Sequence, residues 1–527
     1  MLIAENSFWP PLGHDRMRHR WQSWAAWWSG DLDELRTRTP CTAPGGYWAR
    51  RAAKPGDREM HLPLAADIAR TSAELVCGDT PVIEFEDDTA TQKAWDDLAQ
   101  TIGWANTLLE AGEISAALGG VYLRPVWDKN TAGHPLLTTV RADEALPEFR
   151  YGVLHSVTFV DELPAPDHWK RRKDAEAWRH LEHHERGQIR HELWLGTTSN
   201  TGQLLPLTEH PATEHLEPVI DTTSVRPDGG LLVDYVPNDL PQPLDRLPLG
   251  RSDLQGLETM LDALDEAWDS WMRDIELGKA RVLLSKEMLD PVSQASSSGG
   301  KWGFGRRQNT TPAKAFDTDA KVFVPLDIPA EDAGKPAPIT LVQFLIRVKE
   351  HYETCMALAE QITSRAGYSP QTMGMHVDGQ LSGTAMRRRD HRSYRTRDRK
   401  RRYVRPAAER VPETLMLIGA AVFGGPKPKA RPTLTWRETD QADPMETANV
   451  INTLRQARAL STEIAVQMAH PEWDKTQVGD EVKRLAKEDA ALTAPPPTGH
   501  EPPVWAKPIQ NQPPQPEPEP EPEDDDQ

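Results

Sequence analysis

Two stretches of the chain carry apolar residues at helical spacing over several turns. In the first, intervals of three and four residues alternate along Leu254, Leu257, Leu261, Leu264, Trp268, Trp271 and Ile275. This period predicts a long helix with one packing seam. Acidic residues fall on its other faces, at Asp262, Asp265, Glu266 and Asp269. We expect this acidic stripe to remain available to a partner.

The second seam predicts a helix of similar length. Its positions are Leu341, Phe344, Val348, Tyr352, Cys355, Leu358 and Ile362. Ser252 with Gln255, and Thr340 with Gln343, have the spacing of capping boxes, which predicts a helix start at each pair. Gly367 is typical of a helix C-terminus. Between the two helices, a Gly- and Ser-rich loop and the strand-like KVFVPLDI predict a small β-containing excursion.

The part of the chain before Ser252 mixes helical and strand patterns. Trp21, Trp24, Trp27 and Trp28 recur at helical spacing, which predicts a helix that packs on a core or on another subunit. Helices are predicted at 61–78 and 89–117, with the strand PVIEFE between them. Short β runs separated by Gly, Pro and Asp follow over 120–236. The predicted fold class is therefore α+β with an antiparallel sheet.

Residues 178–195 predict a hairpin with its turn near Arg186 and Gly187. Four histidines and two glutamates lie in it: His180, His183, His184, His191, Glu182 and Glu192. These are metal-ligand types, but neighbouring strand residues point to opposite faces, so the set does not converge easily. We favour a solvated hairpin without a metal.

The remaining chain predicts a strand at 431–436 and helices at 444–458, 462–469 and 478–488. Beyond Thr493, Pro, Glu, Gln and Asp dominate, a composition that predicts a disordered acidic tail over 494–527. The first nine residues lack the pattern of a signal peptide. The apolar run 415–423 is too short to span a bilayer, so no membrane segment is expected.

Residues 387–405 hold eleven basic residues against Asp390 and Asp398. Contact with DNA phosphates and pairing with acidic faces of neighbouring subunits both fit this density. The charges recur on all sides of the predicted helix, so no single stripe is expected, and we favour the subunit contact. The whole chain has a net charge of −19, which argues against a general nucleic-acid coat.

No known catalytic pattern is present. The sequence lacks GxxxxGK[ST], GxSxG and HExxH, and its three cysteines show no CxxC spacing. We therefore expect no enzyme activity, no cofactor and no metal.

Five segments occur in an order that resembles one known family. They are HLPLAADIARTSAELVCGDTP, LEHHERGQIRHELWLGT, LDALDEAWDSWMRDIELGKARVLL, the AEQITSRAGYSPQTMG and SGTAMRRRD region, and HPEWDKTQVGDEVKRL. Together they resemble the portal, or head-to-tail connector, proteins of tailed bacteriophages, in the type found in actinobacteriophages. The resemblance implies a ring, typically of twelve subunits, at one capsid vertex of the virion. A separate ATP-driven terminase pumps DNA through such a ring, and the tail joins it later.

The resemblance also implies a division of the chain. It assigns a wing (1–251), a stem (252–283 and 338–366), a clip (284–337), a tunnel loop region (367–384), a wing-returning helix and strand (385–442), crown helices (443–493) and the acidic tail. The implied partners are other copies of the chain, the terminase large subunit, head-completion or adaptor proteins, and the major capsid and scaffolding proteins. Double-stranded DNA would pass through without sequence specificity, and assembly would take place in the host cytoplasm.

Candidate site residues fall into two groups. DNA- or terminase-facing candidates in the implied clip and tunnel loop are Lys301, Arg306, Arg307, Gln371, His376 and Gln380. Candidates in the basic helix, for subunit contact or for DNA, are Arg387, Arg388, Arg389, Arg392 and Arg395. A different function stays open: a sequence-specific DNA-binding protein that uses 387–405 as its recognition helix.

Overall fold

The computed structural model describes residues 3–11, 14–54, 59–86, 88–166, 176–245, 248–278, 281–285, 323–326, 340–342, 346–375, 383–436, 444–470, 473 and 475–493. The chain divides into two units, Met1–Thr439 and Asp440–Gln527. Among the described helices, none is both long enough and apolar enough to cross a membrane.

The first unit begins with helices. They are α1 (Asp15–Ser29), α2 (Leu32–Arg38), α3 (Tyr47–Ala53), α4 (Leu64–Cys77), α5 (Thr89–Thr101) and α6 (Trp104–Leu118). Trp24 and Trp27 are fully buried and Trp21 nearly so, because the tryptophan stripe of α1 packs into the main core with α4 and α6. The prediction that this stripe is a packing face is confirmed.

One predicted helix is two in the structure. The period over 89–117 indicated a continuous helix, but α5 ends at Thr101 and α6 begins at Trp104. Gly103 between them has a φ of +65°, a conformation that glycine adopts at no steric cost. The apolar pattern runs across the break because both helices bury residues in the same core.

Two antiparallel sheets follow. The first has the order β10-β2-β3, formed by β10 (Asp234–Pro237), β2 (Gly120–Val126) and β3 (Leu136–Arg141). The second has the order β4-β5-β6-β7-β8, with β9 paired to β7. Its strands are β4 (Ala145–Arg150), β5 (Val153–Leu163), β6 (Glu176–Glu185), β7 (Gln188–Thr197), β8 (Asn200–Leu205) and β9 (Val219–Asp221). The α+β class and the antiparallel pairing are confirmed.

The histidine hairpin is β6–β7, with its turn at Arg186 and Gly187 as predicted. The expectation of a solvated hairpin is wrong, because β6 is a central strand and His180, His183 and His184 are all buried. His180 stacks on His191 with ring centroids 5.2 Å apart, and His184 Nε2 lies 2.6 Å from Glu182 Oε1. No group of three or more potential metal ligands occurs within the described residues.

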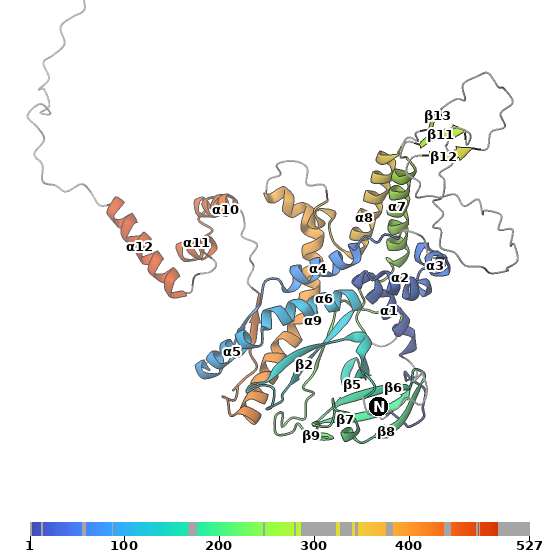
Figure 1. Cartoon of the computed structure of the whole chain (residues 1–527). Coiled ribbons are helices and arrows are strands. Elements are labelled where there is room, and N and C mark those ends of the chain that lie inside the picture. Colours follow the sequence, from blue (N-terminus) through green and yellow to red (C-terminus); the bar gives the residue numbers. More distant parts are fainter. Residues whose placement is uncertain are drawn as a thin grey trace, which may run out of the picture. The chain divides into compact units, whose positions relative to one another are not determined.

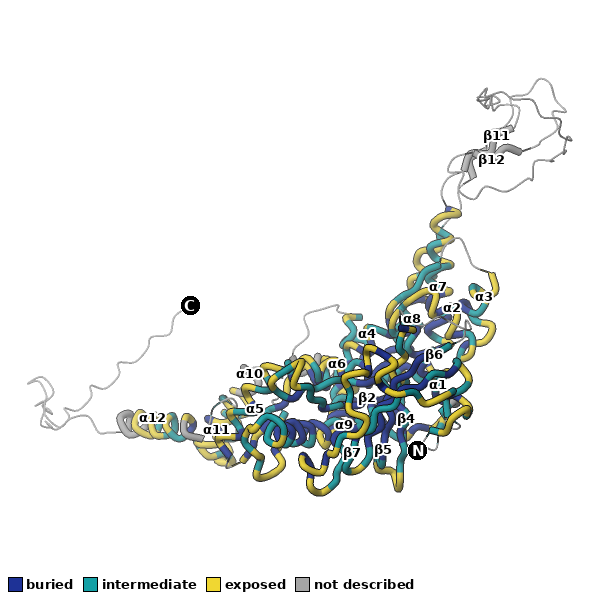
Figure 2. The backbone as a smooth tube through the Cα atoms, turned by 60° about the horizontal axis from the view of Figure 1, so that its bottom comes forward, coloured by how far each residue is buried: buried dark blue, intermediate teal, exposed yellow. Residues whose placement is uncertain are grey.

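Three long helices complete the first unit: α7 (Glu258–Leu277), α8 (Val348–Ala366) and α9 (Gly383–Phe423). Figure 1 shows α7 and α8 side by side, and Figure 2 shows exposed and half-buried positions along both. Strand β1 (Val82–Glu84) pairs with β14 (Thr433–Thr435), which follows α9. Both strands were predicted.

A small sheet separates α7 from α8. It has the order β12-β11-β13, formed by β11 (Arg281–Ser285), β12 (Phe323–Leu326) and β13 (Thr340–Val342). β11 pairs parallel with β12 and antiparallel with β13. The predicted strand KVFVPLDI is confirmed as β12. The other two strands were not predicted: β11 overlaps the end of the first predicted stem segment, and β13 lies in residues predicted as the second helix.

Neither predicted capping box starts a helix. Residues 253–257 form turns before α7, and the Ser252 hydroxyl donates to Ala117 O at 2.6 Å while accepting from Leu254 N. Gln255 Oε1 has no partner within the described part of the chain. Thr340 belongs to strand β13, and α8 begins only at Val348. In both cases a contact with a distant segment replaces the local cap, so the sequence motif placed the helix start too early.

The second unit holds α10 (Pro444–Gln456), α11 (Thr462–Ala469) and α12 (Lys475–Thr493). Ser461 caps α11 by accepting from Ile464 N. These helices confirm the three that the sequence predicted. The acidic tail 494–527 lies outside the described residues.

Candidate functional site

Aromatic and ionic contacts join the C-terminal end of α7 to the N-terminal end of α8. The rings of Trp271 and His351 stack with centroids 6.2 Å apart and an interplanar angle of 5°. Asp274 near the end of α7 accepts from Arg347 Nη2 at 3.0 Å, just before α8, and lies 2.9 Å from His351 Nε2. Hydrogen bonds from His351 and Arg347 lower the pKa of Asp274. Because the end of α7 meets the start of α8, the two helices are antiparallel.

Carboxylates in the N-terminal half of α7 anchor the helix to α3 and to the segment before α4. Asp262 accepts from the backbone nitrogens of Tyr47 and Trp48, at the first turn of α3, where a helix N-terminus favours negative charge. Asp265 accepts from Trp48 Nε1 at 2.8 Å and from Leu62 N at 2.9 Å, and its side chain is 1% exposed. Both aspartates are buried structural acceptors.

The outer acids of α7 are also engaged. Glu266 binds Arg50 at 2.6 Å, and Asp269 binds Arg51 at 2.8 Å. The prediction of an available acidic stripe on this helix is therefore wrong. Its charges were visible in the sequence, but their partners lie far earlier in the chain, on α3 and the segment that follows it.

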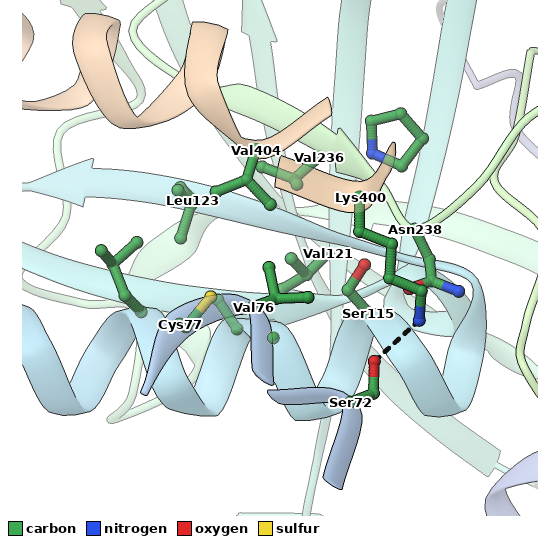
Figure 3. Close-up of a pocket in the computed structure, with 14 residues that line it drawn as sticks. Ser72, Val76, Cys77, Ser115, Val121, Leu123, Val236, Asn238, Lys400 and Val404 are labelled. Atoms are coloured by element: carbon green, nitrogen blue, oxygen red, sulfur yellow. Dashed lines mark hydrogen bonds between the residues drawn. The ribbon is translucent and has the colours of Figure 1, made fainter. Parts of the chain in front are cut away.

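A buried junction ties α9 to the segments around the α7–α8 pair. We call it the Lys400 junction, formed by Lys400, Asp253, Tyr368 and Ser72. Lys400 Nζ lies 2.5 Å from Asp253 Oδ2, 2.7 Å from Ser72 Oγ and 2.9 Å from Tyr368 Oη. Tyr368 Oη also donates to Asp253 Oδ2 at 2.8 Å. Figure 3 shows Lys400 reaching Ser72 among apolar side chains.

Electrostatics at the Lys400 junction follow from its burial. Burial lowers the pKa of Lys400, and the charge of Asp253 acts in the opposite direction. Burial and Asp253 both raise the pKa of Tyr368 well above its usual value. The adjoining cavity measures about 20 Å³ and is lined largely by apolar side chains. That volume holds about one water, so the junction is a structural tie rather than a ligand pocket.

The start of α9 is joined to the end of α8 by further polar contacts. Thr396 Oγ1 donates to Gly367 O at 2.8 Å, and Ser393 Oγ accepts from Ser369 N at 2.9 Å. Asp390 accepts from the hydroxyls of Ser369 and Thr372. The turn after α8 and the N-terminal half of α9 are thus packed against each other.

The architecture agrees with a family model that spans almost the whole chain. The model for phage portal proteins of the SPP1 Gp6-like type matches residues 16–493. The chain belongs to the phage portal protein family. This membership decides for the portal function and against the sequence-specific DNA-binding protein. The portal family is a structural, non-enzymatic one, and its members are virion components that connect head and tail.

Two solved structures similar to this portal protein come from phage-like particles. One is a chain from the neck of a native GTA particle computed with C12 symmetry, at 15% identity, covering 80% of this chain and 98% of that chain, with a TM-score of 0.35. The other is from the neck of an empty GTA particle computed with C6 symmetry, at 14% identity, with the same coverage and a TM-score of 0.38. No curated protein matches the chain at a significant level.

Packing divides the basic side chains of α9 in the portal protein into a buried set and an exposed set. Lys400 and Arg401 point inward and are buried, and Arg401 stacks over the Trp436 ring at 4.5 Å and donates to Val76 O. On the other side, Arg392, Arg395 and Arg402 are exposed, and within the described residues they form no hydrogen bond or ion pair. Among the described side chains of this helix, the expectation that no single stripe emerges is wrong, because burial removes the inward charges.

The other predicted site residues of the portal protein are mostly not placed. Gln371 lies in the turn Pro370–Met373, where its side chain accepts from Ser369 Oγ at 3.0 Å. The residues outside the described part are Lys301, Arg306, Arg307, His376 and Gln380. Three further arginines belong to α9, but their side chains are outside the described part of the structure: Arg387, Arg388 and Arg389.

Sequence reasoning missed the Lys400 junction. Lys400 is the single lysine among ten arginines in 387–405, which was a weak signal that its role differs. Asp253 follows the misassigned cap at Ser252, and Tyr368 follows Gly367 in a turn. Nothing in the local pattern joins these positions, since Tyr368 lies 32 residues, Asp253 147 residues and Ser72 328 residues from Lys400 along the chain.

Proposed function

We propose that copies of this chain, twelve to a ring, form a DNA channel at one capsid vertex, used for genome packaging, genome ejection and head-to-tail joining. The family match over residues 16–493 carries the proposal. The antiparallel α7–α8 pair supports it, because two long helices anchored at one end supply a wall element for each subunit.

In this proposal the α7–α8 pair belongs to the stem (252–283 and 338–366). The clip (284–337) contains β12, while β11 crosses its first boundary and β13 lies just beyond its second. The wing is formed by 1–251 with the returning helix and strand 385–442. Residues 367–384 form the tunnel loop region, residues 443–493 the crown and 494–527 the tail. The Lys400 junction then lies where stem, tunnel loop and wing segments meet, which gives it a role in holding the channel elements together.

The proposed partners follow from this position. The terminase large subunit docks during packaging, and head-completion or adaptor proteins dock afterwards. Major capsid and scaffolding proteins surround the ring, and assembly takes place in the host cytoplasm. Double-stranded DNA passes through without sequence specificity, since a conduit needs contacts with phosphates rather than with bases.

Negative-stain electron microscopy of the purified full chain tests the ring. Annular particles with a central channel, and a solution mass of about twelve subunits by light scattering, are the expected result. A monomer or dimer at all protein concentrations, with compact particles, would contradict the proposal.

A further inference from the structure

One face of α9 carries an uninterrupted row of arginines. We call it the arginine stripe: Arg392, Arg395, Arg399 and Arg402. Their spacing of three, four and three residues places them on one side of the helix. All four are exposed, and the row extends about 15 Å along the helix axis at the usual rise per residue.

The stripe is not neutralised by its own helix. Asp398, close to it in sequence, binds Arg397 at 3.0 Å, and Asp390 is held by Ser369 and Thr372. Arg399 touches Asp239 at 3.3 Å, but that carboxylate also serves Arg251. The other three arginines have no partner within the described residues. Apart from the Arg399–Asp239 pair, the stripe therefore carries positive charge that no described residue neutralises, in a chain that is acidic overall.

The stripe is fixed in position by buried residues beside it on α9. Lys400 and Thr396 are buried and bound to Asp253 and Gly367. A rigid helix with arginines at regular intervals is preorganised, so binding a polyanion costs little ordering of the backbone.

The chemistry of the stripe matches phosphate. Arginine presents a planar fork of donors that suits bidentate binding of phosphate or carboxylate. The acidic face of α7, the obvious carboxylate partner on a second copy, is already occupied by Arg50, Arg51 and the N-terminus of α3. One strand of duplex DNA offers a phosphate about every 3.4 Å along its axis, so the stripe runs beside about four of them.

We propose that the arginine stripe of α9 binds the phosphate backbone of double-stranded DNA. The proposal rests on the proposed portal function for its ligand, and it assigns the contact to one row of arginines that the sequence pattern did not separate from the rest of the basic run. The contact reads no base, because arginines aligned along the backbone make charge-assisted bonds to phosphates alone.

The test is binding of the full chain to a fluorescent duplex of random sequence, between about 50 and about 200 mM salt. The variant R392Q/R395Q/R402Q is expected to bind at least about ten-fold more weakly at the low-salt end. Its plot of log affinity against log salt should be shallower by about 0.9 for each phosphate that the variant no longer binds. Arg399 is left intact so that its ion pair with Asp239 stays.

The matched control is R70Q/R150Q/R484Q, which removes the same charge from exposed arginines elsewhere. It should bind DNA like the parent chain. Unchanged binding by the stripe variant, or an equal loss of affinity in the control, would overturn the proposal. So would a reduced assembly mass in the stripe variant with its DNA affinity intact, because the stripe would then bind a second copy.

A truncated variant that ends at Thr493 tests whether the arginine stripe binds DNA or the acidic tail. If the three substitutions weaken DNA binding equally with and without residues 494–527, the proposal stands. If their effect vanishes without the tail, the stripe binds the tail and the proposal fails. Electron microscopy of the same samples keeps the two claims apart: a parent chain that forms no ring, but whose DNA binding depends on the stripe, refutes the ring alone.

Discussion

Helix α7 is rich in acidic residues and helix α9 in basic residues, but the two differ in how many of these charges are paired within the subunit. On α7 the carboxylates of Asp262 and Asp265 are buried acceptors, and Glu266 and Asp269 are paired with arginines of α3. On α9 the inward Lys400 and Arg401 are buried and bound, whereas Arg392, Arg395 and Arg402 have no partner in the described residues.

The difference shows that charge density does not tell which charges are available to a partner. Helix α7 is covered on its charged faces by α3 and by the segment leading into α4, so its acids serve the interior of the subunit. Helix α9 is buried on one side and exposed on the other between Arg392 and Arg402. The acidic surface expected on α7 is therefore taken up within the subunit, and an unexpected arginine surface appears on α9.

The largest effect is expected at the Lys400 junction. Asp253→Ala leaves the buried Lys400 ammonium without its carboxylate, and breaking a buried ion pair in this way costs about 3–5 kcal/mol of unfolding free energy. Urea unfolding followed by tryptophan fluorescence measures it. The double variant D253A/K400M should recover much of the stability, and a cost of the single change below about 1 kcal/mol would contradict the role of the junction.

The acids of α7 give the next largest contrast. Asp265→Ala removes the acceptor of Trp48 Nε1 and Leu62 N and the carboxylate that pairs with His61 Nδ1, and we expect a destabilisation of about 2–3 kcal/mol. Glu266→Ala, one position along, removes a half-exposed pair with Arg50 and should cost at most about 1 kcal/mol. Equal destabilisation in the two variants, measured by urea unfolding, would show that α7 is not divided into buried anchors and outer pairs.

The buried histidines of β6 and β7 should make stability depend on pH. Burial lowers the pKa of His191 to about 4, below its ordinary value of 6.5. Between these values the unfolded chain binds more protons than the folded one, so stability falls as the pH is lowered from 6.5 towards 4. For this one group the slope is at most about 1.4 kcal/mol per pH unit.

Unfolding in urea across this pH range measures that effect. The variant H191Q should show a flatter dependence than the parent chain, whereas substituting the exposed His391 in the same way should leave the slope unchanged. A parent chain whose stability does not change between pH 6.5 and 4 would contradict the assignment.

The smallest effect on stability is expected at the arginine stripe. R392Q/R395Q/R402Q breaks no contact within the described residues, so its unfolding free energy should stay within about 0.5 kcal/mol of the parent value. Circular dichroism and urea unfolding check this. A destabilisation above about 2 kcal/mol would show that these arginines stabilise the fold, as the carboxylates of α7 do.

Much of the secondary structure could be predicted from local pattern. The existence of α7 and α8, the β6–β7 turn at Gly187 and the three helices from Pro444 onward follow from spacing. The second predicted seam is only partly correct, because Leu341 lies in β13 and Val348 and Tyr352 are exposed. Local motifs failed where a distant segment competes for the same group. Ser252 bonds Ala117 rather than capping a helix, and Thr340 joins β11 rather than starting α8.

The sequence by itself determined the α+β class, the order of the long helices and the portal resemblance, because these depend on periodicity and on motifs within single segments. Only the tertiary structure decided which charges are paired inside the subunit. Asp265 meets Trp48, and Lys400 meets Asp253, only after segments far apart in the chain have packed together. Burial then turns one face of α9 into a structural tie and leaves the other as a row of exposed arginines.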